Sequence, residues 1–184
     1  MSKVTVLKLA FVLFVAAGLS AATLSIIYSV TKPKIDDFKA RKLQSDLMEV
    51  LQGSVDFEVI LADTLWRGLD STGAVTGGAF KVFPKGYGGP IETLVGLKID
   101  TTITGIIIAS PAEGMKETPG LGIKVREDWF RDQFAGRKST ELLLKKDGGE
   151  LDAVTAATIS SRAVVNGVKE GAELYLRYLT ESEE

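Results

Sequence analysis

A run of 23 uncharged residues, 9–31, lies between Lys8 and Lys32. A helix rises about 1.5 Å per residue, so the run is about 35 Å long and can cross a hydrocarbon core about 30 Å thick with some tilt. Residues 1–31 are therefore predicted to form a single transmembrane anchor.

A cleaved signal peptide is the competing interpretation of the same run. Lys3 and Lys8 would form its basic start, residues 9–19 its apolar stretch and residues 20–22 its small-residue cleavage site. Apolar character resumes after those small residues, between Leu24 and Val30, which a processed signal does not need. An uncleaved anchor accounts for the whole run.

The charge bias around the span favours a cytoplasmic location for the large domain. Two basic residues precede the span, and five follow it closely, between Lys32 and Lys42. Basic flanks tend to stay in the cytoplasm, although this rule is weak for long translocated domains.

The remaining chain predicts an α+β fold. Residues 32–53, with Pro33 at the start, read as an amphipathic connecting helix, and residues 54–184 form the folded domain. Segments of β character predict a mostly antiparallel sheet flanked by helices. They are residues 57–61, 64–69, 74–82, 91–99, 103–109 and 141–144. A short helix over residues 126–134, with Trp129 on its apolar face, and a last helix over residues 160–179 complete the prediction.

The composition excludes several kinds of chemistry. The chain has no cysteine and no histidine, which excludes disulfides, iron–sulfur clusters, thiolate metal sites and the usual general base, so redox chemistry requires an organic cofactor. We expect no metal site and no catalytic side chain. The formal charge of −2 comes from 22 basic and 24 acidic residues that are interspersed, so nucleic acid is not an expected partner.

Three stretches are rich in glycine or hydroxyl groups. Residues 85–90 (KGYGGP, with Tyr87) and residues 117–122 (ETPGLG) can each be a plain turn, or a loop whose backbone approaches a flat ligand. Residues 152–161 (DAVTAATISS) lead into the last helix, where N–H groups and the helix dipole favour a phosphate. Ordinary N-capping is the alternative for that stretch.

The sequence from Asp152 to Thr158, Asp-x-x-Thr-Ala-Ala-Thr, resembles the site at which a flavin transferase esterifies FMN. The other two stretches resemble, in the same order, the remaining motifs of the same FMN-binding domain. The family is the FMN-binding G-subunit of the Rnf ion-translocating electron-transport complex, together with its homologue in the sodium-pumping NADH:quinone oxidoreductase, NqrC. The compact length is more similar to the Rnf protein.

This resemblance implies a covalent FMN on Thr158. It also implies a cofactor-binding set that holds the phosphate end or lies against the flavin. The set is Tyr87, Glu117, Thr118, Gly120, Leu121, Gly122, Asp152, Thr155, Ala156 and Ala157. Lys145 or Lys146 is expected to offset the phosphate charge.

The sequence departs from the family pattern at two positions. Ala156 stands where the family usually has glycine, which is tolerated if the backbone there is not left-handed. Met115 stands where the family often has histidine, and we assign it no role in the site.

The resemblance also implies partners and a location. The expected partners are other subunits of a membrane electron-transport complex and the flavin transferase. The domain is expected on the outer face of a bacterial cytoplasmic membrane, against the charge bias. The function implied is electron relay within a ferredoxin:NAD oxidoreductase complex, without an independent active site. A membrane-anchored redox sensor or adaptor and a flavin-dependent reductase for a soluble substrate are the alternatives.

Overall fold

The computed structural model describes residues 3–180, and side chains within residues 7–179. It contains two compact units, residues 1–44 and 45–184.

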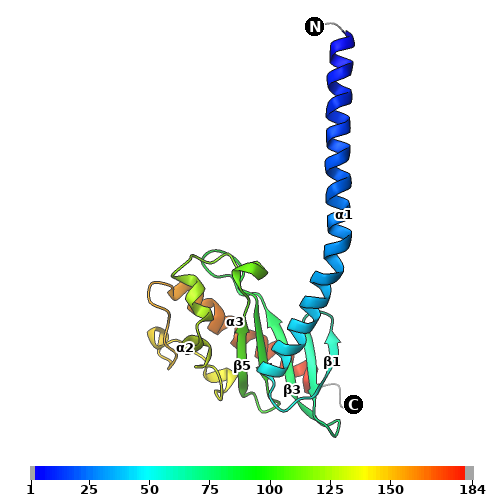
Figure 1. The fold of residues 1–184 in the computed structure, drawn as a ribbon. Helices are drawn as coiled ribbons and strands as arrows, with labels where there is room; N and C mark the ends of the chain where they lie inside the picture. Colours follow the sequence, from blue (N-terminus) through cyan, green and yellow to red (C-terminus); the bar gives the residue numbers. More distant parts are fainter. Residues whose placement is uncertain (1–2, 181–184) are drawn as a thin grey trace. The chain divides into compact units, whose positions relative to one another are not determined.

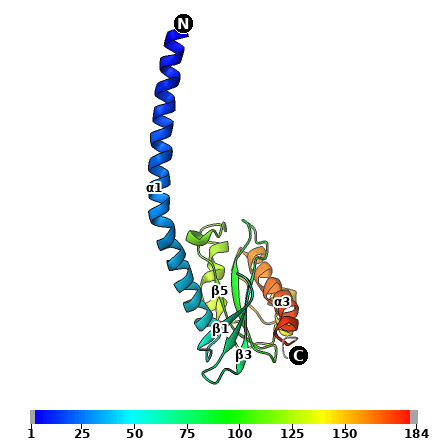
Figure 2. The ribbon, with the colours of Figure 1, turned by 90° about the vertical axis from the view of Figure 1, so that its right-hand side faces the viewer.

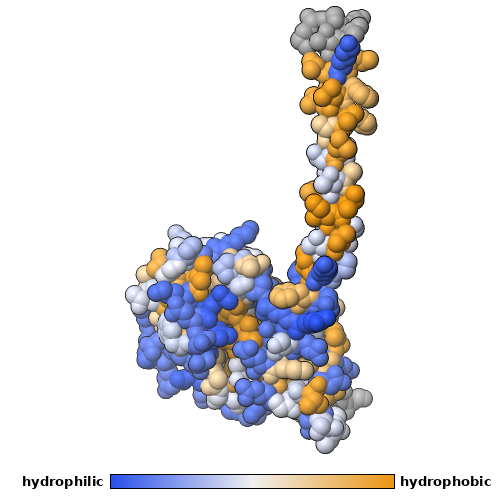
Figure 3. Space-filling model, viewed as in Figure 1, coloured by the Kyte–Doolittle hydropathy of each residue, from blue (hydrophilic) through white to orange (hydrophobic). Residues whose placement is uncertain are grey.

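The first unit consists of most of helix α1, Lys3–Val50. Figure 3 shows apolar side chains around its upper part, and large apolar residues such as Phe14 and Leu24 are exposed. The hydroxyl groups of Ser20 and Thr23 donate to carbonyl oxygens one turn earlier, at 2.9 Å each, so they are satisfied without water. By length and composition, α1 is the one helix of the described residues suited to crossing a membrane, which is consistent with a membrane anchor.

Pro33 lies inside α1 and does not begin a second helix, so that part of the prediction is wrong. The ring removes one N–H donor from the ladder, and the helix continues on both sides of it. Four residues of the apolar face that was predicted for the connecting helix differ in exposure. Ile35 and Phe38 are exposed, whereas Leu47 and Val50 are buried.

The second unit contains one antiparallel sheet whose strand order follows the sequence (Figures 1 and 2). Its strands are β1 (Asp56–Leu61), β2 (Leu65–Leu69), β3 (Val75–Val82), β4 (Thr93–Leu97) and β5 (Ile103–Ile108). The predicted α+β class and these five strands are confirmed, with ends that differ by no more than two residues. The sixth predicted strand is wrong: a 3₁₀ turn, η3 (Ser139–Glu141), is followed by a single bridge between Leu144 and Leu151.

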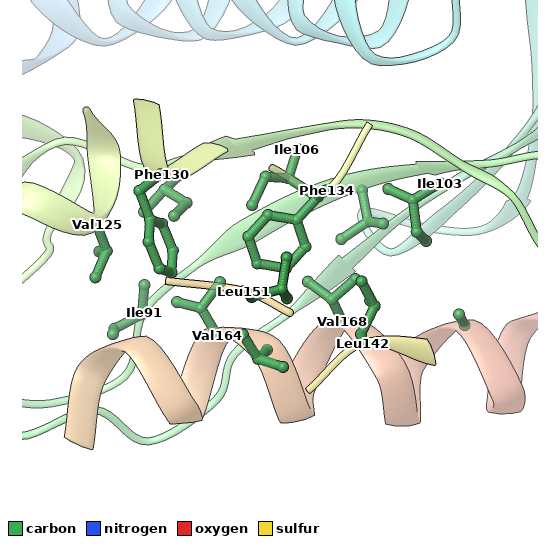
Figure 4. Close-up of a cluster of buried hydrophobic side chains, with 14 of the residues drawn as sticks. Ile91, Ile103, Ile106, Val125, Phe130, Phe134, Leu142, Leu151, Val164 and Val168 are labelled. Atoms are coloured by element: carbon green, nitrogen blue, oxygen red, sulfur yellow. The ribbon is translucent and has the colours of Figure 1, made fainter. Parts of the chain in front are cut away.

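Helix α3 (Thr158–Thr180) covers one face of the sheet and encloses the main core. Figure 4 shows Phe130 and Phe134 between the strands and α3, where Val164 and Val168 meet them. The short helix α2 (Asp128–Arg131) presents Phe130 to this core. Trp129 is 46% exposed, contrary to its predicted place on the apolar face, and its indole N–H donates to Glu127 at 2.6 Å.

Residues from 45 onward belong to the second unit, so the last turn of α1 is part of it. This turn packs on the opposite face of the sheet. The hydroxyl of Thr104 donates to the carbonyl oxygen of Val50. Gly96 makes the closest approach, because a Cβ placed there would lie 2.1 Å from that same oxygen. The helix end can therefore rest on the sheet only because Gly96 has no side chain.

We predict that Gly96→Ala destabilises the domain by about 1–3 kcal/mol, since the methyl group must displace the end of α1. Thermal unfolding of the full chain in detergent measures the effect. Gly105, the residue paired with Gly96 on β5, is the matched control, because its added Cβ would lie 3.8 Å from Val50, an ordinary contact. Equal losses of stability in Gly96→Ala and Gly105→Ala would contradict this explanation.

Candidate functional site

The three predicted stretches meet around the carboxylate of Glu117, whose residue is only 4% exposed. One carboxylate oxygen accepts the Gly88 N–H at 3.0 Å, and the other accepts the Ser160 hydroxyl at 2.8 Å. The N–H of Tyr87 makes a longer contact, 3.5 Å, with the Ser160 oxygen. Glu117 thus joins the loop between β3 and β4 to the first turn of α3.

Two glycines make this arrangement possible. A Cβ on Gly88 would lie 2.0 Å from the carbonyl oxygen of Lys116, and one on Gly122 would lie 2.0 Å from a carboxylate oxygen of Glu117. Both distances are far inside van der Waals contact, so a side chain at either position would force the loops apart. The two glycine-rich stretches are packing requirements of the Glu117 contact as well as turns.

The other residues predicted in the second stretch lie at the surface. Thr118, Gly120 and Leu121 are exposed, whereas Gly122 is buried at the start of the 3₁₀ helix η2 (Gly122–Arg126). Tyr87 is also exposed, at 73%. Glu117 therefore lies beneath a surface that the flanking residues form.

The third stretch leads into α3, and Thr158 is the first residue of that helix. The first hydrogen bond from inside this helix joins the Ser161 N–H to the Ala157 carbonyl oxygen at 3.0 Å. Earlier N–H groups of the first turn precede the helix's own bonds, and they carry the positive end of its dipole. The Thr158 hydroxyl therefore lies where a negatively charged group is stabilised.

A lysine reaches this hydroxyl from the preceding 3₁₀ turn, η4 (Lys145–Asp147). The Lys146 ammonium donates to the Thr158 Oγ1 at 3.1 Å. Its neighbour Lys145 is engaged elsewhere, in an ion pair of 2.6 Å with Asp152. Of the two lysines considered from the sequence, the structure brings Lys146 to Thr158.

The turn that carries Lys146 is tied to α3 by a second ion pair. The Arg162 guanidinium donates to both oxygens of Asp147, at 2.7 and 2.8 Å. These hydrogen bonds hold the pKa of Asp147 below its ordinary value and raise that of Arg162, so the pair persists through the neutral range. Arg162 lies four residues after Thr158, and the pair therefore fixes η4 beside the first turn of α3.

The remaining predicted residues shape the approach to Thr158. Asp152 is exposed, and its N–H donates to the Gln133 side chain at 2.6 Å. Thr155 is exposed, and Ala157 is buried. The structure thus assigns Asp152 to the ion pair and hydrogen bond that hold the segment entering α3.

Ala156 has a φ of +60°, in the left-handed region. The condition for tolerating alanine at this position is therefore not met, because a Cβ costs about 1–2 kcal/mol in that conformation. The left-handed residue turns the chain two residues before Thr158, which explains why glycine suits this position. Met115, the other departure, is 6% exposed and belongs to the core.

Several contributors to the site did not stand out in the sequence. Ser160 belonged to the third stretch but was assigned no role of its own, and only the fold brings its hydroxyl to Glu117. The Asp147–Arg162 pair links residues 15 apart, a separation that no helical spacing marks. Ile159, next to Thr158, is 55% exposed and is a further exposed apolar side chain of the site, like Tyr87 and Leu121.

An open groove of about 670 Å³ lies along a different flank of α3. Phe83, Lys85, Asn166 and Leu174 are among the residues that line it. None of the residues predicted to bind the flavin belongs to its lining. The candidate site is instead the surface around Glu117 and Thr158.

Comparison with known proteins identifies the family of the chain. The family model described as FMN-binding domain matches residues 86–173, which include the second and third stretches and all of the first except Lys85. The G-subunit of the Na⁺-translocating ferredoxin:NAD⁺ oxidoreductase complex of Acetobacterium woodii is 32% identical over 194 aligned residues, covering 92% of this chain and 91% of that protein. The chain belongs to the G-subunit family of Rnf complexes.

Two further relatives support the Rnf assignment and the fold. The G-subunit of the ion-translocating oxidoreductase complex of Methanosarcina acetivorans is 30% identical, with coverage of 88% of this chain and 89% of that protein. The crystal structure of NqrC from Shewanella oneidensis has a TM-score of 0.52 and 18% identity, covering 70% of this chain and 72% of that one. The latter similarity establishes a shared fold. The chain is therefore an Rnf complex subunit with an FMN-binding domain and an N-terminal apolar helix.

We predict that Ala156→Gly stabilises the chain by about 1 kcal/mol, because glycine removes the left-handed strain before Thr158. Thermal unfolding of the full chain in detergent measures the change. Ala153→Gly is the matched control in the same segment: the φ of Ala153 is not positive, so glycine there only adds flexibility to the unfolded chain and lowers stability. A loss of stability in Ala156→Gly would contradict the strain.

Proposed function

We propose that the chain carries FMN as a phosphoester on Thr158 and relays electrons within an Rnf-type membrane complex. The observation that carries this proposal is the 3.1 Å contact between the Lys146 ammonium and the Thr158 hydroxyl at the first position of α3. A lysine and a helix N-terminus together form the positive surroundings that a phosphate needs.

The residues present fit FMN at both of its ends. Lys146 and the first-turn N–H groups of α3 can receive the phosphate, while Tyr87, Leu121 and Ile159 offer exposed apolar surface for the flavin. Attachment through the phosphate leaves the ring chemically unsubstituted, and the bound flavin supplies the electron-transfer chemistry. The chain's own residues hold, orient and surround it, so no catalytic side chain is required.

The partners of this proposal follow from the family. The relative in Acetobacterium woodii is a subunit of a ferredoxin:NAD⁺ oxidoreductase complex, so we assign this chain to electron flow between those two carriers, through other subunits. A flavin transferase installs the cofactor. Membership of the Rnf family favours this role over that of the quinone-reductase homologue and over a redox sensor or adaptor.

We also propose that α1 stays attached as the anchor and that the FMN domain lies on the outer face of a bacterial cytoplasmic membrane. The satisfied hydroxyl groups of Ser20 and Thr23 suit a permanent span. The outer location is where the family's transferase acts, and we give it more weight than the five basic residues that follow the span.

The attachment is tested by purifying the chain from cells that contain the transferase and viewing a denaturing gel under ultraviolet light. We expect flavin fluorescence with the wild-type chain and none with Thr158→Ala, since no other residue is proposed to bear the ester. The mass gain should match FMN minus water. An equally fluorescent Thr158→Ala chain would refute the attachment site.

Lys146→Ala and Lys145→Ala form a matched pair within this test. Loss of Lys146 should slow the appearance of fluorescence after transferase induction about tenfold, because a charge-assisted hydrogen bond at the acceptor is lost. Loss of Lys145 should have a smaller effect, since its partner is Asp152. Equal effects of the two substitutions would contradict the role of Lys146.

The orientation is tested with alkaline phosphatase fused after Glu184. This enzyme is active only outside the cytoplasm, so we expect active fusions. A second fusion carrying a reporter that works only in the cytoplasm should be silent. The reverse pattern would show that the basic flank determines the topology and that the outer-face proposal is wrong.

A further inference from the structure

Glu117 is a charged side chain in a place where the fold does not require a charge. It is only 4% exposed, and among the side chains described, within residues 7–179, no lysine or arginine forms an ion pair with it. Buried acidic residues are normally paired with a cation, because taking a charge out of water is costly. The reason for its presence must therefore lie in the site that surrounds it.

The oxygens of Glu117 are the acceptors in both of its hydrogen bonds. The Gly88 N–H can only donate, and it reaches one oxygen at 3.0 Å. The Ser160 hydroxyl donates to the other oxygen at 2.8 Å. Acceptance at both oxygens is the bonding pattern of a carboxylate.

Three residues that lie against this carboxylate each follow an exposed apolar residue of the site in the sequence. Tyr87 precedes Gly88, Leu121 precedes Gly122, and Ile159 precedes Ser160. Each of these exposed side chains is thus one residue away from a group that touches Glu117. A flat ring resting on those side chains would lie above the buried carboxylate.

We propose that Glu117 is a positioning residue that also sets a low reduction potential for the flavin, an inference that rests on the attachment of FMN proposed above. Each electron added to the ring adds negative charge. A fixed carboxylate nearby, in surroundings from which water is excluded, disfavours that charge and so disfavours reduction. The Gly88 and Ser160 donors offset part of its field.

The test is the midpoint potential of the flavin-loaded full chain, titrated with dithionite and followed by visible absorption. Glu117→Gln keeps the shape and removes the charge, so the potential should rise, on the order of a tenfold change in the equilibrium constant, which is 59 mV for one electron. Ser160→Ala removes a donor and leaves the charge less offset, so the potential should fall.

Shifts of opposite sign in the midpoint potentials of the two variants distinguish an effect of charge from an effect of packing. Mere loosening of the loops would move both variants in the same direction, toward free FMN, and that result would overturn the proposal. Glu141→Gln is the control: its side chain is exposed on η3, so solvent screens the charge and the potential should not change. A shift in this control equal to that of Glu117→Gln would also overturn the proposal.

Failure of the proposal and failure of the attachment are distinguishable. A wild-type chain without flavin fluorescence on the denaturing gel contradicts the attachment to Thr158. A loaded Glu117→Gln chain whose potential is unchanged or lower contradicts the role of Glu117. If Glu117→Gln binds no flavin, the loaded Ser160→Ala chain decides alone: a lower potential supports the proposal, and an unchanged or higher one overturns it.

Discussion

The hydrogen bonds to the Glu117 carboxylate are the interaction on which the candidate site depends. They connect segments near residues 88, 117 and 160, which are far apart in the chain and belong to no common strand or helix. The sheet and α3 supply a rigid support, but neither element brings the two glycine loops to the helix N-terminus. Besides this acid, buried apolar side chains such as Ile91 and Met115 hold the loops to the core.

A second set of contacts, around Thr158, is electrostatic and lies at the surface. Lys146 contacts the hydroxyl, and the Asp147–Arg162 pair holds the turn that carries Lys146. The site thus combines a positive end, suited to a phosphate, with a buried negative charge beneath its apolar part. That separation suits a cofactor with an anionic tail and a ring whose charge changes.

The sequence was sufficient to predict the elements, because their signals are local. Alternation of apolar residues located the five strands, and a helical period located α3. Pro33 misled the prediction because a proline marks a helix start only statistically, and α1 continues through it. Residues 141–144 have strand-like composition, but only one bridge pairs them with a neighbour, and a strand is defined by its partner.

The sequence predicted the site as a set of residues and could not predict their arrangement. Motif resemblance selected Glu117 and Thr158. It could not distinguish a buried side chain that joins several segments from one that is exposed to a ligand, because that difference depends on the contacts with Gly88 and Ser160. Ala156 illustrates the same limit in the backbone. From the residue type alone, a methyl group at this position was expected to be tolerated on condition that the backbone is not left-handed. The φ of +60° shows that the condition is not met, so Ala156 is a strained residue close to the proposed acceptor. A strained backbone two residues before the proposed attachment residue turns the chain ahead of α3, and the chain retains it although glycine would relieve the strain.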